Sequence, residues 1–257
     1  MMKELVSIIM PTYRCGRFIA ESIKSVQAQT YQNWELIVVD DCSGDVTVDV
    51  VLDLKKGDNR INIFQNSSNS GAAVSRNTAL RNARGRWIAF LDSDDLWEPT
   101  KLEKQIAFME ENGYKFSYTC YQEMDSEGEL TGVTVSGPAH VTKFGMFAFC
   151  WPGCLTVMYD RDAIGLLQIE DIKKNNDYAM WLKVCQKADC YLLPEVLAKY
   201  RRGRSGSVSS HSISTMIKWH YKLFRDAEKM GAIPSLWHTG VNLVCGFYKK
   251  MKYVKHG

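Results

Sequence analysis

The feature that most constrains the fold is an alternation of short apolar runs with longer amphipathic segments over residues 6–112. The apolar runs are rich in valine and isoleucine and lie at 6–10, 34–39, 61–64 and 87–91. Strands that are apolar on both faces and are separated by helices belong to parallel sheets covered on both sides. We therefore predict an α/β fold with a Rossmann-like, mostly parallel central sheet and helices on both faces.

The connecting helices are indicated by apolar residues at helical spacing and by glycines beyond their ends. We expect helices at 18–26, 45–56, 72–83 and 99–112. The first strand is expected to stop at Pro11. The second half is less regular, and we expect it to complete a mixed sheet with strands at 116–121, 155–159, 191–193 and 196–200 and a helix at 177–187.

Three polar clusters follow predicted strands. They are Pro11–Thr12–Tyr13, Asp40–Asp41 and Asp92–Ser93–Asp94–Asp95. Ligands of open α/β sheets bind beyond the carboxyl ends of the strands, so one ligand can contact all three clusters. A dinucleotide site would require a GxGxxG motif after the first strand, but only Gly16 is present there. This difference argues against a nicotinamide or flavin enzyme.

The acidic cluster at 92–95 is a candidate metal site. Its crowded carboxylates repel one another unless a cation neutralises them. Oxygen ligands suit Mg²⁺ or Mn²⁺, which usually combine one or two carboxylates with water and substrate phosphates. Helix capping by Asp94 or Asp95 is the alternative. Asp40 and Asp41, at the end of the second strand, can accept a hydrogen bond from a nucleotide base or ribose. Capping of the following helix is the alternative role for these two residues.

The eight cysteines form no CxxC pair, which argues against a zinc site. A chain of this length does not need disulfides, so free thiols are expected. No run of about 18 apolar residues and no signal-peptide pattern is present, and we therefore expect a cytoplasmic protein.

The order of these motifs identifies a resemblance. The segments at 6–13, 29–41, 69–77 and 90–95 together resemble family-2 glycosyltransferases of the GT-A fold, and the similarity continues through 176–182 and 200–209. In detail the chain is similar to the short bacterial transferases that extend O-antigen, capsule or teichuronic-acid repeat units. The resemblance covers residues 5–210, and we predict that residues 1–210 form the glycosyltransferase domain.

The resemblance implies a set of donor-binding residues. Uridine would be held around Pro11, Thr12 and Tyr13 and by Asp41, with support from Asp40. The ribose and a divalent metal, Mn²⁺ or Mg²⁺, would be held by Asp92 and Asp94, with Asp94 as the direct metal ligand. Further donor-side residues within the matching motifs are Gly71, Arg76 and Ser93. A helix-surface salt bridge is the alternative role for Arg76.

By the same resemblance, the general base is Asp177. Inverting transfer needs one such base to deprotonate the acceptor hydroxyl. The family usually has Glu-Asp here, whereas this chain has Asn176 before Asp177, and Asn176 is assigned to the acceptor side. Trp181 and Trp151 are further acceptor candidates, with a core position as the alternative for Trp181. An ordinary first-turn carboxylate is the alternative for Asp177.

The segment at 201–207 is basic and rich in glycine. We predict that Arg201 and Arg204 close over the donor diphosphate, with a solvated basic loop as the alternative. Many relatives carry a metal-contacting His in this loop, but none occurs between Tyr200 and Ser210.

The C-terminal part, 211–257, is predicted to form a basic amphipathic helical tail that bends near Gly231 and Pro234. From Lys199 onward the chain holds 12 Lys and Arg against 2 Asp and Glu, while the remainder holds 20 against 27. Interleaved aromatic and basic residues at 241–255 favour contact with an anionic membrane surface. A helix packed on the domain is the alternative. No nucleic-acid-binding motif accompanies the charge, so nucleic acid is not expected as a partner.

Together these features predict an inverting hexosyltransferase, peripheral to the inner face of the cell membrane. The resemblance implies a UDP-sugar donor, UDP-galactose or UDP-glucose, and a lipid-linked acceptor such as GlcNAc- or GalNAc-diphosphoundecaprenol. A soluble or polymeric glycan acceptor is the main alternative. A non-catalytic sugar-nucleotide-binding subunit is a weaker alternative, because the acidic cluster at 92–95 and the base Asp177 are both present. A nucleotidyltransferase is also weaker, because no glycine-rich, basic activation loop follows the first strand.

Overall fold

Four parallel strands form the half of the molecule that carries the predicted motifs. The computed structural model describes residues 4–203 and 213–257. The strands are β1 (Val6–Thr12), β2 (Trp34–Asp40), β3 (Ile61–Gln65) and β4 (Trp87–Phe90), in the spatial order β3-β2-β1-β4. Because the chain passes from β3 across to β4, the order reverses beside β1. The carboxyl end of β1 is therefore the point where a ligand is expected to bind.

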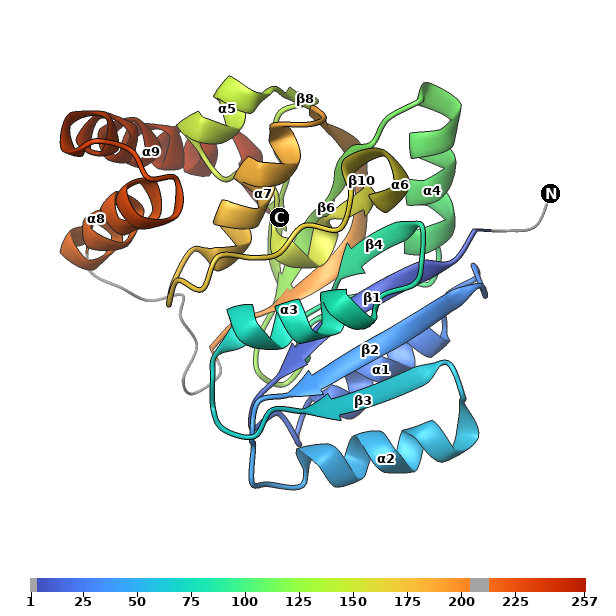
Figure 1. The fold of residues 1–257 in the computed structure, drawn as a ribbon. Coiled ribbons are helices and arrows are strands. Elements are labelled where there is room, and N and C mark those ends of the chain that lie inside the picture. Colours follow the sequence, from blue (N-terminus) through green and yellow to red (C-terminus); the bar gives the residue numbers. More distant parts are fainter. Residues whose placement is uncertain (1–3, 204–212) are drawn as a thin grey trace.

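Helices cover both faces of this sheet (Figure 1). On one face pack α1 (Ile19–Gln27), α2 (Thr47–Gly57) and α4 (Lys101–Asn112), and on the other α3 (Ala72–Asn82) and α7 (Asn176–Cys185). Alternate residues of one strand enter different cores, as Ile8 and Ile9 do. The apolar runs thus reflect burial on both faces, and the predicted α/β fold is confirmed.

The second half completes a mixed sheet of eleven strands within the described residues. Its strands are β5 (Leu96–Trp97), β6 (Phe116–Met124), β7 (Leu130–Val135), β8 (His140–Val141), β9 (Met158–Asp160), β10 (Cys190–Arg201) and β11 (Val254–His256). The path runs β11-β7-β6-β9-β4-β1-β2-β3, and β10 pairs with β5, β6 and β8. The short helices α5 (Lys143–Ala148) and α6 (Arg161–Ile164) lie in the connections.

Three details differ from the sequence-based expectation. β1 continues through Pro11 to Thr12, because Pro11 stands near the strand end and costs only one ladder bond. The strand expected at 155–159 is a 3₁₀ turn, η1 (Cys154–Thr156), followed by β9. The two strands expected at 191–193 and 196–200 are the single strand β10, whose register shifts around Pro194 since proline cannot donate to the ladder.

The predicted tail packs into the same core as the rest of the chain. It consists of α8 (Ile213–Lys222), a π-helical turn η2 (Leu223–Ala227), α9 (Ala232–Tyr253) and β11. Leu223 and Phe224 are fully buried beside α7, and β11 pairs antiparallel with β7. The boundary predicted at 210 lies outside the described residues. None of the helices described is long and apolar enough to cross a membrane.

Lys101 carries a buried amine whose titration gives a testable consequence of this packing. Its side chain is fully buried, its Nζ donates to Gln105 Oε1 at 2.8 Å, and burial lowers its pKa to about 7. Between pH 7 and the ordinary lysine pKa, the unfolded chain binds a proton that the folded chain does not. The stability of the fold therefore rises with pH in this window, by at most about 1.4 kcal/mol per pH unit from this group.

We expect Lys101→Met to remove this slope. Chemical denaturation at pH 6.5 and 8.5 should show the wild type gaining stability relative to Lys101→Met by about 1–2 kcal/mol as the pH rises. Lys104→Met on the same helix is the matched control, because Lys104 is partly exposed and pairs with Glu195. A difference between wild type and Lys101→Met that is independent of pH would contradict the assignment.

Candidate active site

The loops that follow β1, β2 and β4 are bonded to one another. The backbone N–H of Arg14 donates to Ser43 Oγ at 2.9 Å, and the Cys15 thiol donates to the carbonyl of Ser93 at 3.2 Å. The N–H of Asp41 donates to the carbonyl of Thr12 at 2.9 Å. The structure therefore brings the three predicted polar clusters to one place at the switch point of the sheet.

Asp40 and Asp41 are both buried and both organise backbone. Asp40 accepts from the N–H and the hydroxyl of Ser43 and so holds the turn that leads to α2. This contact is close to the helix-capping role that was the alternative to a nucleotide contact for Asp40. Asp41 accepts from the N–H groups of Ser70 at 2.8 Å and Gly71 at 2.7 Å, and so fixes the start of α3.

Gly71 is suited to this contact because its φ of 92° lies in a region that favours glycine. Asp41 also accepts from Asn66 Nδ2 at 2.8 Å. A carboxylate offers about four lone-pair positions, so these three bonds leave capacity for a ligand donor. A uridine contact by Asp41 stays a prediction.

The carboxylates of the acidic cluster at the end of β4 are buried to different extents. Asp95 is 1% exposed, whereas Asp92 and Asp94 are partly exposed. Burial raises the pKa of Asp95 well above its ordinary value, and the negative charges of Asp94 and Asp92 raise it further. Carboxylates that destabilise one another in this way are a suitable donor set for a divalent cation.

Within the described part of the chain, no group of three or more His, Cys, Asp or Glu side chains is placed to hold a metal ion by itself. Asp92 and Asp94 therefore fit a metal that takes its remaining ligands from phosphate oxygens and water, as Mg²⁺ and Mn²⁺ usually do.

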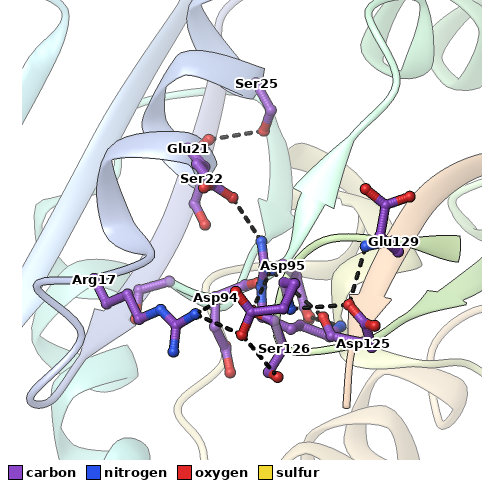
Figure 2. A network of polar contacts seen from close by, with 12 residues as sticks. Arg17, Glu21, Ser22, Ser25, Asp94, Asp95, Asp125, Ser126 and Glu129 are labelled. Carbon is purple, nitrogen blue, oxygen red and sulfur yellow. Dashed lines mark hydrogen bonds and ion pairs between the residues drawn. The ribbon is translucent and has the colours of Figure 1, made fainter. Parts of the chain in front are cut away.

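Arg201 corrects a prediction, because it does not lie in an open loop over the donor. Its side chain is 1% exposed at the end of β10. Its Nε donates to the carbonyl of Asp94 at 2.9 Å, its Nη2 pairs with Glu21 at 2.6 Å, and its backbone N–H donates to Asp95 at 2.8 Å. Figure 2 shows Glu21, Asp94, Asp95 and Ser126 converging around this network.

Arg201 is thus a positioning residue for the acidic loop rather than a diphosphate ligand. Pairing of β10 with β5 and β6 carries it into the interior, where several acceptors compensate its charge. Arg204, the other predicted arginine, lies outside the described residues.

Arg76 connects the acidic cluster to the helix that carries the predicted base. Its side chain is 8% exposed, Nη2 pairs with Asp92 Oδ1 at 2.5 Å, and Nη1 donates to Asn176 Oδ1 at 2.8 Å. The surface salt bridge considered from sequence is therefore a buried one. The Arg76 Nε and the Thr12 hydroxyl are buried with no hydrogen-bond partner among the described residues, which leaves both available to a ligand.

Asp177 lies at the second position of α7 and is partly exposed. Its Oδ1 accepts from the N–H of Tyr178 at 2.9 Å, and its charge helps to raise the pKa of Arg76 after that of Asp92. The guanidinium that pairs with Asp92 therefore also bonds Asn176, the residue that precedes Asp177 on α7.

Asn77 is a positioning residue that the sequence reasoning did not single out, although it ends the motif at 69–77. Its Nδ2 donates to the carbonyl of Ile169 at 2.8 Å, and its Oδ1 accepts from the N–H of Ile169 at 2.7 Å. Asn77 therefore ties α3 to the segment that precedes α7, while Arg76 ties α3 to the first residue of α7 itself.

The two tryptophans predicted at the acceptor side are both in the interior. Trp181 is fully buried and packs edge-on against Phe90, with ring centroids 5.1 Å apart. Trp151 is 7% exposed and donates its Nε1 to the carbonyl of Gly145 at 3.0 Å. Trp181 stands on the inward face of α7, so it takes the core position that was the alternative to an acceptor contact. By contrast, Tyr13, which directly follows β1, is 40% exposed.

Comparison with known proteins assigns this arrangement to a family. Residues 7–141 match the family model described as Glycosyl transferase family 2. The chain is 39% identical over 91% of its length to the putative teichuronic acid biosynthesis glycosyltransferase TuaG of Bacillus subtilis, covering 93% of that protein. It is 39% identical to the Escherichia coli UDP-Glc:alpha-D-GlcNAc-diphosphoundecaprenol beta-1,3-glucosyltransferase WfaP, with 84% of each chain covered. The chain belongs to glycosyl transferase family 2, as the motifs predict.

Solved structures agree on the fold. Staphylococcus aureus TarS 1–349 in complex with UDP-GlcNAc superposes with a TM-score of 0.74 at 19% identity, over 97% of this chain and 76% of that one. The mannosyltransferase PcManGT from Pyrobaculum calidifontis in complex with GDP-Man and Mn²⁺ gives 0.65 at 17% identity, over 95% and 75%. The fold is the GT-A fold, and the protein is a glycosyltransferase.

We expect Arg76→Gln to lower kcat/KM for sugar transfer about 100-fold. The substitution removes a charge-assisted bond to Asp92 and loosens α7, a loss of about 2–3 kcal/mol in transition-state stabilisation. Arg81→Gln on the same helix is the matched control, since Arg81 bonds only exposed groups among the contacts described. Activity within twofold of wild type would show that the link between Asp92 and Asn176 is not needed.

Proposed function

We propose that the protein is an inverting, metal-dependent hexosyltransferase. It would move glucose or galactose from a UDP-sugar to a lipid-linked acceptor such as GlcNAc- or GalNAc-diphosphoundecaprenol during synthesis of a bacterial surface polysaccharide. The observation that carries the proposal is the Arg76 bridge, which joins Asp92 of the acidic cluster to Asn176, the residue before Asp177 on α7. The names of WfaP and TuaG support the substrate class.

In this proposal the donor lies over the carboxyl ends of β1, β2 and β4. Uridine would contact Pro11, Thr12, Tyr13 and Asp41, with the unpartnered Thr12 hydroxyl as one hydrogen-bonding group. Asp40 would act indirectly by holding the turn at Ser43. Ser93 and Gly71 would contribute backbone to the same surface.

Asp94 and Asp92 would hold Mn²⁺ or Mg²⁺ together with the donor phosphates. When bound, such an ion neutralises the charge that develops on the leaving diphosphate. The residues of this chain supply the rest of the arrangement. Arg201 fixes the Asp94 backbone, and Arg76 sets the distance between Asp92 and α7.

Asp177 would remove the proton from the acceptor hydroxyl as the oxygen attacks the anomeric carbon. The new glycosidic bond forms while the bond from that carbon to the phosphate oxygen breaks, so UDP leaves on the opposite face. Asn176 would hold Arg76 in place without adding a second negative charge next to the base. A lipid-linked acceptor would place the protein at the inner face of the cytoplasmic membrane, in contact through its basic C-terminal helix.

Release of UDP from a UDP-sugar should require a divalent cation. We expect excess EDTA to abolish release and Mn²⁺ to restore it, and we expect Asp94→Ala to lose at least about 100-fold in rate, because the charge on the leaving group is no longer neutralised. Asp53→Ala is the control, since Asp53 is an exposed carboxylate on α2. Full activity in excess EDTA would exclude the metal-dependent mechanism.

Asp177→Asn should separate binding from chemistry. The variant is expected to bind UDP with a Kd within twofold of wild type by calorimetry, but to transfer about 10²–10⁴-fold more slowly, which is the usual contribution of a general base. Asp162→Asn provides a matched first-turn carboxylate on α6. Normal turnover by Asp177→Asn would place the base elsewhere.

A further inference from the structure

The helix α9 has its polar side chains inside and its apolar side chains outside. Ser235, Thr239 and Asn242 face the protein and are at most 3% exposed. The large apolar residues are 43% to 82% exposed and form what we term the apolar stripe, which consists of Ile233, Leu236, Trp237, Val244, Phe247, Tyr248 and Met251. An ordinary surface helix shows the opposite arrangement.

Helical geometry places the apolar stripe on one side of α9. At about 100° per residue, its members fall within about 60° of a common direction, and the buried polar residues fall on the opposite side. Lys250 and Lys252 lie about 100° to either side of the centre of the stripe. From Ile233 to Met251 the stripe is about 27 Å long, at about 1.5 Å per residue.

The inward face of α9 is fixed, so the outward direction of the stripe is a property of the fold. Asn242 Nδ2 donates to the carbonyl of Phe147 at 3.1 Å, and Lys249 Nζ donates to the carbonyl of Trp151 at 2.7 Å. The hydroxyls of Ser235 and Thr239 bond carbonyls one turn earlier in the chain, at 2.8 and 2.7 Å. Strand β11 then pairs with β7 and holds the far end of α9.

We propose that the apolar stripe inserts into the headgroup region of an anionic lipid bilayer and holds the active site against the membrane. From Lys229 to the end, the chain contains no Asp or Glu, and four lysines lie between 249 and 255. Apolar and aromatic side chains flanked by lysines suit an interfacial helix on anionic lipid. A second copy of the chain fits less well, because two stripes in contact would bring lysines together with no acidic residue on either helix to pair with them.

The position of α9 relative to Asp177 gives this docking a role, which rests on the proposed function. Asn242 and Lys249 hold the loop around Cys150. Tyr178, the neighbour of Asp177 on α7, donates its hydroxyl to the carbonyls of Met146 at 2.7 Å and Phe147 at 3.4 Å, and Asn242 of α9 bonds the same Phe147 carbonyl. The base therefore lies close to the inner face of α9, and about one helix diameter, 10–12 Å, separates that face from the stripe. An acceptor whose diphosphate lies at the membrane surface could present its sugar to Asp177 across this distance.

Vesicle co-sedimentation of the full chain tests the proposal. The wild type is expected to bind vesicles of equal parts phosphatidylglycerol and phosphatidylcholine, and to bind phosphatidylcholine alone at least tenfold more weakly. The double variant Trp237→Glu/Phe247→Glu should lose at least tenfold in binding to the mixed vesicles. Leu52→Glu, which changes an exposed leucine on α2, should bind like wild type. Lys250→Glu/Lys252→Glu should lose the preference for the anionic vesicles while keeping the stripe intact.

The proposal would be overturned if the wild type failed to bind mixed vesicles or if the stripe variant bound as well as wild type. It would also be overturned if light scattering without lipid showed a wild-type dimer that the stripe variant cannot form, since a second copy would then cover the stripe. UDP release by the stripe variant with a water-soluble acceptor should equal that of wild type, which reports on folding. Absence of transfer by every variant and by wild type, with vesicle binding as expected, would contradict the proposed function but not the docking surface.

Discussion

The compensation of three crowded carboxylates at the end of β4 is the constraint on which the rest of the structure depends. Asp92 pairs with the buried guanidinium of Arg76, whereas Asp95 accepts from the backbone N–H of Arg201, whose side chain holds the Asp94 carbonyl. A buried charge is costly unless it is paired and hydrogen-bonded. The two arginines bond different parts of the molecule, Arg76 to Asn176 and Arg201 to Glu21, so the bonds that hold the cluster also assemble the site.

Arg201 ties the cluster to α1 and to the end of β10, whereas Arg76 ties it to α7. The acidic cluster and the helix that carries Asp177 are thereby connected through charged groups rather than through apolar packing alone. Asn176 is informative here, because it gives Arg76 an uncharged acceptor. Asp92 is then the one carboxylate among the described contacts to pair directly with Arg76, and its geometry is coupled to that of the helix bearing Asp177.

The parallel half of the fold and the meeting of its polar loops could be predicted from sequence, because runs such as 34–39 are apolar on both faces and the carboxyl ends of parallel strands share one edge. Arg201 could not be placed, because its basic, glycine-rich surroundings resemble a solvent loop until the pairing of β10 is known. Trp181 follows Asp177 by one turn, but only the packing shows that its ring is buried against Phe90. For α9, the pattern indicates an amphipathic helix, whereas the buried partners of Asn242 reveal which face is outside.

The central claim is that a single carboxylate, Asp177, drives a direct displacement while the cluster at β4 holds the leaving diphosphate. The most direct test is the anomeric configuration of the transferred hexose, measured by proton NMR coupling in the product formed from the α-anomer of UDP-glucose or UDP-galactose. One displacement inverts the configuration, so a β-linked hexose is predicted. An α-linked product would require two displacements or a different mechanism, and would contradict the account.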